Sequence, residues 1–259
     1  DPFKDYKLEY KGTSSVMNFT GVYKAHLLSD SEAQPTRNAN QRKLDISELD
    51  IYTRVYHLVY ESAGEVWYTQ SSDNGDTWSP EELVSGYQHT ATNPSLCALQ
   101  EDVYVVFMEG DVVRLRQRHE GGWYDHPLYD DLNNNGATST PVVAAGFFCQ
   151  DPDGIARDHV VAVLWDENEN LRYNLLRIEG TTVAQDQNYG DLQRSGVAAT
   201  NSDSYPLFPS IVSDHDFIYF SASWREGDAV KAARLEIPSC NPVAFDLYTL
   251  LRPDVSSPS

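Results

Sequence analysis

One unit of sequence recurs along the chain and constrains its fold more than any other feature. Each copy holds a Pro followed by small or β-branched residues, then a run rich in Val, Ile, Tyr and Phe, and then a second run after an acidic or Gly-bearing turn. The central runs start at Val55, Val103, Val160 and Phe217, at spacings of 48, 57 and 57 residues. A period of about 40–50 residues that accepts loop insertions is typical of β-propeller blades.

The runs themselves have the length and composition of β-strands, being short, rich in β-branched and aromatic residues, and bounded by Gly, Asp, Asn or Pro. The central runs are almost wholly apolar, as expected for strands covered on both faces, whereas residues 113–116 alternate apolar and basic side chains. Residues 44–49 are the one weak helix candidate. We therefore predict an all-β fold, a β-propeller of four-stranded antiparallel blades, with about five blades and six as the alternative.

We expect residues 1–259 to form a single β-propeller domain. The chain is divided into a divergent first blade with its loop, four further blades and a tail, at 5–50, 52–92, 93–139, 140–207, 208–251 and 252–259. The sequence begins at Asp1 without an initiator Met, which we interpret as a processed protein or an excerpt of a longer one.

Residues 71–78 read S-S-D-N-G-D-T-W and match the pattern S-x-D-x-G-x-T-W at every fixed position. An Asp in such a tight turn accepts backbone N–H bonds, the Gly supplies a positive φ, and the Trp is a large apolar group that closes against strands. The octapeptide resembles the Asp-box, or BNR repeat, of sialidase-like β-propellers. The resemblance implies a structural turn between the third and fourth strands of a blade, formed by Ser71, Asp73, Gly75, Thr77 and Trp78.

The resemblance also implies where a ligand binds, because the sites of these propellers lie on one face of the ring. That face carries the loops between second and third strands and the loops between successive blades. Acids, aromatic residues and cations in those loops are suited to sugars, although any propeller has polar turns. The candidate ligand-binding residues are Tyr87, His89, Glu109, Tyr129, Arg194 and Arg225.

Three carboxylates in equivalent turns of successive blades are the catalytic candidates: Glu61, Glu109 and Asp166. A glycosidase needs two carboxyl groups at a suitable separation, so convergence of two of these would indicate a glycoside hydrolase. The resemblance does not by itself predict a sialidase. Family members that cleave sialic acid bind its carboxylate with three arginines, and the predicted face offers only Arg194 and Arg225.

Residues 131–136 read D-L-N-N-N-G and fit the start of an oxygen-ligand calcium loop. Asp131, Asn133 and Asn135 are therefore candidate ligands for a structural Ca²⁺, but Val142 occupies the twelfth position, where an EF-hand has a bidentate Glu. The alternative is that Asp, Asn and Gly are there for the turn alone. We expect no cofactor to be required.

The chain carries 39 Asp and Glu against 19 Lys and Arg, a formal charge of −20. Nucleic acids and anionic membranes bind basic surfaces, so we expect neither as a partner. The apolar runs are too short to cross a bilayer, so we expect no membrane insertion. The three cysteines, Cys97, Cys149 and Cys240, allow at most one internal disulfide, and their pairing stays open.

These features together predict a secreted or cell-surface propeller that acts without catalysis. It would be a binding or adhesion module, or a subunit of an extracellular assembly, with a glycan or an extracellular protein as its ligand. The alternative is an exo-acting glycoside hydrolase of the same fold. A scaffold with no small ligand is a third class, which would expose aromatic residues on a side or bottom surface.

Overall fold

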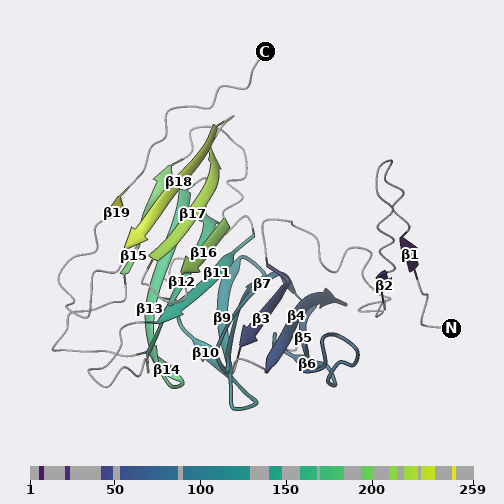
Figure 1. Cartoon of the computed structure of the whole chain (residues 1–259). Coiled ribbons are helices and arrows are strands. Elements are labelled where there is room, and N and C mark those ends of the chain that lie inside the picture. Colours follow the sequence, from purple (N-terminus) through teal and green to yellow (C-terminus); the bar gives the residue numbers. More distant parts are fainter. Residues whose placement is uncertain are drawn as a thin grey trace, which may run out of the picture.

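The computed structural model of the chain contains β-strands and no helix in the residues that it describes (Figure 1). These are residues 6–8, 21–23, 42–48, 53–86, 90–128, 140–147, 158–167, 170–183, 194–200, 210–214, 219–226, 229–236 and 247–248. Within this part of the chain no helix is available that is long and apolar enough to cross a membrane. The weak helix candidate at residues 44–49 is wrong, because Leu44–Glu48 is a strand that pairs along the next strand.

Four sheets follow one another along the chain, each an antiparallel meander. The first sheet holds β3 (Leu44–Glu48), β4 (Arg54–Ser62), β5 (Glu65–Ser71) and β6 (Glu82–Leu83). The second holds β7 (Ala91–Leu99), β8 (Asp102–Glu109), β9 (Val112–His119) and β10 (Gly122–His126). The third holds β11 (Val142–Phe147), β12 (Asp158–Glu167), β13 (Asn170–Glu179), β14 (Thr182–Val183) and β15 (Arg194–Thr200). The fourth holds β16 (Ser210–Asp214), β17 (Tyr219–Glu226), β18 (Ala229–Glu236) and β19 (Leu247–Tyr248).

The sheets are arranged as successive blades of a propeller. The first strand of each sheet contacts the first strand of the next, in the order β3, β7, β11 and β16, and the later strands of each sheet lie farther out (Figure 1). This arrangement confirms the predicted all-β fold with four-stranded antiparallel blades. The first of these sheets begins at Leu44, inside the segment 5–50 that we interpreted as a separate blade and loop. The number of blades in the whole chain stays a prediction.

The third sheet departs from the four-stranded pattern. The outer edge of β13 pairs with β14 at Ile178 and Glu179, and with β15 over its opposite end, from Asn170 to Leu175. Two short partners thus share the edge that a single fourth strand covers in the other blades. A separate pair, β1 (Tyr6–Leu8) and β2 (Gly21–Tyr23), forms a two-stranded antiparallel sheet.

Apolar side chains fill the spaces between successive sheets. Because neighbouring residues of a strand point to opposite faces, one strand can contribute side chains to two of these spaces. On β8, Val103, Val105 and Phe107 pack against Val59 and Tyr68 of the first sheet. Alternate residues of the same strand, Tyr104, Val106 and Met108, pack against the third sheet, whose contribution includes Val161, Val163, Trp165, Leu176 and Ile178. A third cluster joins the third and fourth sheets through Leu164, Leu175, Ile211, Phe220 and Trp224.

The predicted Asp-box segment forms a hydrogen-bonded turn between β5 and β6, the third and fourth strands of the first sheet. The Asp73 carboxylate accepts hydrogen bonds from the Thr77 amide (2.8 Å), the Thr77 hydroxyl (2.6 Å) and the Ser71 hydroxyl (2.8 Å). These bonds lower the pKa of Asp73 to about 2, the Thr77 hydroxyl contributing most. The Gly75 amide donates to Ser71 Oγ (2.9 Å), and the Trp78 ring lies beside Gly75.

Gly75 has a φ of +85°, a region that L-residues adopt at a cost. We expect Gly75→Ala to destabilise the fold by about 1–2 kcal/mol in urea unfolding, because the Cβ forces a left-handed conformation. The exposed Ser72→Ala in the same turn serves as the control and should change stability by less than about 0.5 kcal/mol. A Gly75→Ala variant as stable as the wild type would show that this turn does not require the positive φ.

Candidate functional site

Two of the three catalytic candidates are buried between sheets. Glu61, near the end of β4, is 3% exposed, and its carboxylate accepts the backbone N–H of Asn93. Asn93 has a φ of +55° and lies where the pairing of β7 with β8 shifts register. Glu61 therefore holds the irregular start of the next blade. Asp166, near the end of β12, is 2% exposed.

The third candidate, Glu109, lines an open pocket of about 430 Å³ at the edge of the second sheet. Glu109 ends β8 at the turn into β9, and its Oε2 lies 3.0 Å from Arg114 Nε. The pocket brings this pair together with the loops that leave β6 and β10, and its other lining residues are Gly86, Phe107, Leu115, Arg116, Asp125, His126 and Pro127. Neither Glu61 nor Asp166 is among them, so the three candidate carboxylates do not converge there.

Strand β9 supplies the cations of this region. Arg114, Arg116 and Arg118 are paired across the sheet with Phe107, Val105 and Val103, so they share the face that packs on the first sheet. Their side chains are 43%, 20% and 16% exposed in that order, so the row runs from the pocket into the interface between the sheets. The alternation seen in the sequence thus places an arginine row between two blades.

Each arginine of the row has an acidic partner. Arg114 pairs with Glu109 (3.0 Å), Arg116 with Asp125 (2.7 Å between Nε and Oδ1), and Arg118 with Glu82 (2.8 Å). Arg116 also donates to the backbone oxygen of Val84, in the first sheet's final loop. The first two pairs line the pocket, which therefore presents guanidinium donors and carboxylate acceptors side by side.

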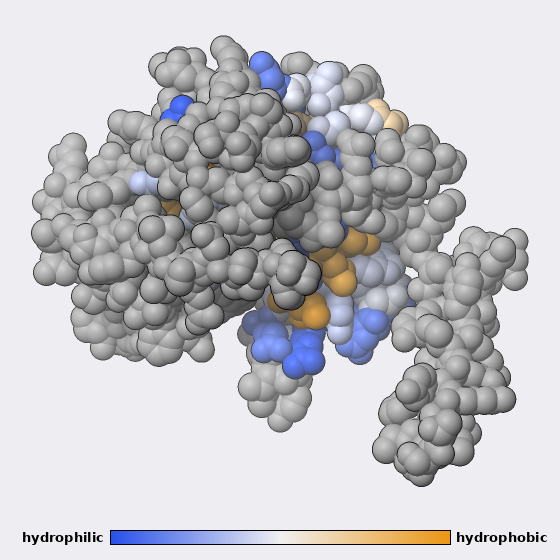
Figure 2. Space-filling view, turned by 90° about the horizontal axis from the view of Figure 1, so that it is seen from above, coloured by the Kyte–Doolittle hydropathy of each residue, from blue (hydrophilic) through white to orange (hydrophobic). Residues whose placement is uncertain are grey.

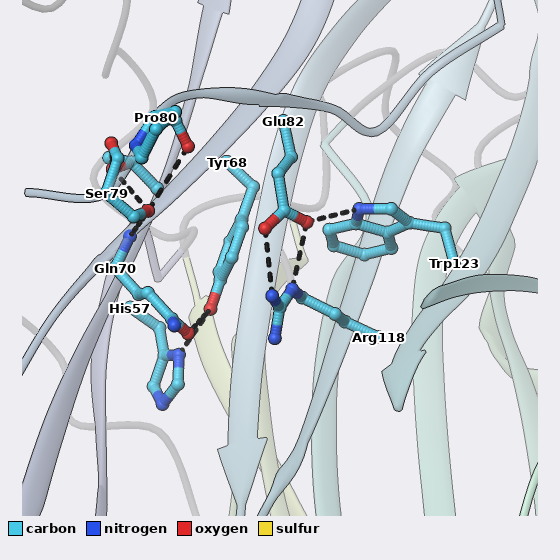
Figure 3. Close-up of polar contacts among 9 residues, drawn as sticks. His57, Tyr68, Gln70, Ser79, Pro80, Glu82, Arg118 and Trp123 are labelled. Carbon is cyan, nitrogen blue, oxygen red and sulfur yellow. Dashed lines mark hydrogen bonds and ion pairs between the residues drawn. The ribbon is translucent and has the colours of Figure 1, made fainter. Parts of the chain in front are cut away.

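The third pair belongs to a polar network inside the interface between the first and second sheets (Figure 3). Arg118 donates to both oxygens of Glu82, at 2.9 and 2.8 Å, and Trp123 Nε1 donates to Glu82 Oε2 at 3.0 Å. The Arg118 guanidinium carbon lies 5.3 Å from the centre of the Tyr68 ring, and Trp123 packs edge-on against the same ring. These contacts join β6, β9 and β10, and they serve to lock two blades together.

His57 extends this network toward the centre of the propeller. Its Nδ1 lies 2.7 Å from the Tyr68 hydroxyl, which donates to Gln70 Oε1 (Figure 3). Its Nε2 lies 2.9 Å from Ser47 Oγ. Burial lowers the pKa of His57 to about 4. Because both ring nitrogens are engaged by hydroxyl groups inside the interface, His57 is a structural histidine.

A second polar cluster lies between the second and third sheets, around Asp102. Its carboxylate accepts from His119 Nδ1 (2.7 Å) and Gln117 Nε2 (3.0 Å), and its other oxygen lies 3.2 Å from His159 Nδ1. Gln117 Oε1 accepts a hydrogen bond from His126 Nε2, at 2.7 Å. Burial opposes ionisation of Asp102, but the hydrogen bonds from His159, His119 and Gln117 prevail and lower its pKa.

His126, at the far end of this cluster, connects it to the candidate pocket. The residue is 4% exposed and also lines the pocket, and burial lowers its pKa to about 4. Asp102, His119 and His159 in turn line a separate pocket of about 360 Å³. No group of three His, Cys, Asp or Glu side chains with metal-ligand geometry occurs among the described residues.

Several predicted site residues lie outside the described residues: Tyr87, His89, Tyr129, Asp131, Asn133 and Asn135. Arg194 and Arg225 lie on β15 and β17, where the structure describes the backbone. Of the cysteines, Cys97 is a buried free thiol, and burial raises its pKa to about 12. Cys149 and Cys240 lie outside the described residues.

Sequence reasoning missed most of the pocket. Arg114, Arg116, Asp125 and His126 lie within strands, not in the loops that the resemblance pointed to. The one available signal was the alternation of apolar and basic residues on β9. It identifies a polar face but not that this face abuts another blade, which depends on how the sheets stack.

Comparison with known proteins gives fold-level similarities. No known family model matches the sequence, and no curated protein sequence is significantly similar to it. A fungal lectin from Aleuria aurantia, described as a six-bladed β-propeller with a novel fucose recognition mode, aligns with a TM-score of 0.49 and 8% identity. The alignment covers 79% of this chain and 62% of the lectin, so this chain spans less than two thirds of the lectin's length.

Two further solved structures align over similar shares of the chain. An exo-1,5-α-L-arabinanase from a bovine ruminal metagenomic library has a TM-score of 0.41 and 15% identity, over 79% of this chain and 76% of the arabinanase. A protein described as a glycoside hydrolase has a TM-score of 0.38 and 12% identity, over 87% of this chain and 51% of the hydrolase.

The two buried histidines predict how stability depends on pH. The unfolded chain protonates its histidines near pH 6.5, whereas folded His57 and His126 resist protonation down to about pH 4. Between these pH values the unfolded state therefore binds more protons than the folded state. The contribution of each histidine to the free energy of unfolding is fully present above about pH 6.5 and is lost as the pH falls toward 4. At pH 5 the free energy of unfolding should be lower by about 2 kcal/mol for each histidine.

Urea unfolding of the wild type and of His57→Gln and His126→Gln at pH 7.5, 6, 5 and 4.5 tests this expectation. Each substitution should flatten the fall in the free energy of unfolding between pH 6.5 and 4.5. An equally steep fall in both variants would show that other groups cause the acid sensitivity.

Proposed function

We propose that this chain is a non-catalytic carbohydrate-binding propeller, and that the pocket beside Glu109 binds a neutral sugar. One observation carries the proposal: the Glu109–Arg114 and Asp125–Arg116 pairs line a single open pocket. We further propose that the protein belongs to the sialidase-like Asp-box propellers. It would act as a binding or adhesion module that is secreted or displayed on the cell surface. The hydrogen-bonded turn around Asp73 supports this placement, since it lies between a third and a fourth strand.

The chemistry of the pocket suits hydroxyl groups. A sugar hydroxyl both donates and accepts, so adjacent hydroxyls are well matched by a carboxylate and a guanidinium held next to each other. Arg114 and Arg116 present planar N–H donors, and their acidic partners hold them in place. A volume of about 430 Å³ lies within the range of small-ligand pockets.

The charge balance favours a neutral ligand over an acidic one. Both arginines of the pocket are already paired with carboxylates, and the chain as a whole carries −20. An acidic sugar would have to displace Glu109 or Asp125 from its arginine, against the repulsion of the surrounding charge.

Binding without hydrolysis follows from the surroundings of the carboxylates. A glycosidase needs one carboxyl group to donate a proton and a second to act as base or nucleophile. Glu109 and Asp125 both accept from arginines, and Glu61 is buried against the backbone of Asn93. A glycoside hydrolase therefore remains an outcome of the test below and not the proposal.

A glycan array followed by calorimetry with the best neutral glycan tests the function. We expect Glu109→Gln and Arg114→Met each to weaken binding by about 10–100-fold, because a lost charge-assisted hydrogen bond costs about 1.5–3 kcal/mol. Arg54→Met is the matched control, since it removes an exposed arginine that pairs with Glu48 on β3. It should leave the affinity within about twofold of the wild type.

Three results would contradict the proposal. They are the absence of binding to any glycan, an affinity that Glu109→Gln and Arg114→Met leave unchanged, and release of sugar from the bound glycan that Glu109→Gln abolishes.

A separate prediction concerns the Ca²⁺ site that we propose at Asp131, Asn133 and Asn135. Chelation by EDTA should lower the thermal stability of the protein, which is checked by thermal unfolding with and without EDTA.

A further inference from the structure

The pocket beside Glu109 is built on a pattern that recurs in the chain. Residues 107–114 read F-M-E-G-D-V-V-R, and spans of the same length read W-D-E-N-E-N-L-R at 165–172 and W-R-E-G-D-A-V-K at 224–231. Each span begins with an aromatic residue, has a Glu at its third position and ends with a cation. The first sheet lacks both the Glu and the cation, because residues 60–67 read Y-E-S-A-G-E-V-W.

The strand registers give the second and third sheets the same arrangement of this pattern. Phe107 is paired with Arg114 across β8 and β9, and Trp165 is paired with Arg172 across β12 and β13. Phe107 belongs to the apolar cluster shared with the first sheet, and Trp165 to the cluster shared with the second. The third sheet therefore places an aromatic residue and an arginine against the second sheet, as the second does against the first.

The register also identifies the acid of the second span. Glu109 is the last residue of β8 and Glu167 is the last residue of β12, and each is paired with the first or second residue after its turn that begins the next strand. Glu167 is therefore the counterpart of Glu109 in the third sheet, whereas the earlier candidate Asp166 lies one residue before it.

The third sheet also contains buried polar atoms without a partner. Within the described part of the chain, neither the oxygen nor the nitrogen of the Asn174 side-chain amide has a hydrogen-bond partner, and the same holds for Nε1 of Trp165. Asn174 is 0% and Trp165 1% exposed. They are diagonal neighbours on one face of β12 and β13, a separation of about 7–8 Å that long side chains can bridge. Buried polar groups normally have partners, so these atoms indicate a polar ligand.

The two positions differ in charge. Two residues beyond the cation of each span, Arg116 is paired across the sheet with Asp125, whereas Asn174 is paired with Ser195. An acid and a base at one position are thus replaced by two neutral residues at the other. A carboxamide both donates and accepts hydrogen bonds, as sugar hydroxyls do, so the third sheet is also suited to a neutral sugar.

Buried residues can form the floor of such a site. Phe107 is 1% and His126 4% exposed, yet both line the pocket beside Glu109. Trp165 occupies the position of Phe107, and its partner Arg172 is only partly buried. The space-filling view shows apolar side chains at the surface next to hydrophilic ones (Figure 2). Small-ligand sites combine apolar contact with a few polar groups in this way.

We propose that the third sheet carries a second site for the same neutral sugar, at its interface with the second sheet. Trp165 Nε1 and the Asn174 amide hydrogen-bond to sugar hydroxyls, and Arg172 supplies the guanidinium that Arg114 supplies in the first site. This second site rests on the proposed function, because its ligand class is that of the pocket beside Glu109. Two sites in one chain allow multivalent glycans to bind more tightly than single sugars.

Calorimetric titration with the neutral monosaccharide that the glycan array selects counts the sites. The wild type should bind at least two sugars per chain. Arg172→Met should weaken one site at least tenfold, so the number of sugars bound with wild-type affinity falls by one. Arg114→Met should remove the other site in the same way. Arg54→Met is the matched control, since it makes the same change at an exposed arginine on β4, and it should alter neither the number nor the affinity.

Asn174→Leu keeps the test valid if Arg172→Met fails to fold. Leu has nearly the shape of Asn and needs no hydrogen bond, so the sugar-free variant should unfold at a temperature no lower than that of the wild type. The same variant should lose one sugar site in the titration.

Two results would overturn the second site and leave the proposed function intact. One is loss of a site in Arg114→Met with no change in Arg172→Met and Asn174→Leu. The other is a wild type that binds one sugar, which Arg114→Met abolishes, because the buried amide would then be satisfied by water alone. A wild type that binds no sugar would contradict the proposed function itself. Loss of a site in Arg172→Met and Asn174→Leu, with Arg114→Met unchanged, would support the second site and refute the first.

Discussion

Face-to-face packing of apolar strands is the interaction on which this structure depends. A strand buried on both sides contributes alternate residues to two different interfaces, and β8 does so with Val103, Val105 and Phe107 on one face and Tyr104, Val106 and Met108 on the other. Each blade therefore forms half of the core of its neighbours. At about 25 cal/mol per Å² of buried apolar surface, such interfaces supply most of the stability of a protein with no helices in its described part.

Two groups of polar side chains inside these interfaces hydrogen-bond to one another. Glu82 accepts from both Arg118 and Trp123, and Asp102 accepts from His119 and Gln117, so none of these charges is buried without a partner. The same arrangement explains the candidate site. At the buried end of the arginine row of β9, Arg118 makes contacts between the two blades. At the exposed end, Arg114 lies beside Glu109 and lines the pocket. The blade-to-blade contacts and the pocket that we propose as the sugar site thus use the same strand.

Much of the fold could be predicted from the sequence, and less of the site. The central runs became β4, β8, β12 and β17 because β-branched runs bounded by turn residues have few alternatives. Residues 44–49 misled because a six-residue stretch fits helical and strand periods equally well, and pairing with β4 decides between them. Glu61 and Glu109 looked alike as turn acids, yet one is buried against a backbone amide and the other lines a pocket.

The all-β class, the blade repeat and the Asp73 turn can be derived from the sequence alone, because each depends on residues close together in the chain. Which acids and arginines meet depends instead on how the sheets stack. Glu82 and Arg118 are 36 residues apart, and Gly86 lies beside Glu109 only because the loop leaving one blade crosses the next. Such contacts depend on the stacking of separately folded sheets, and no local pattern encodes the stacking geometry.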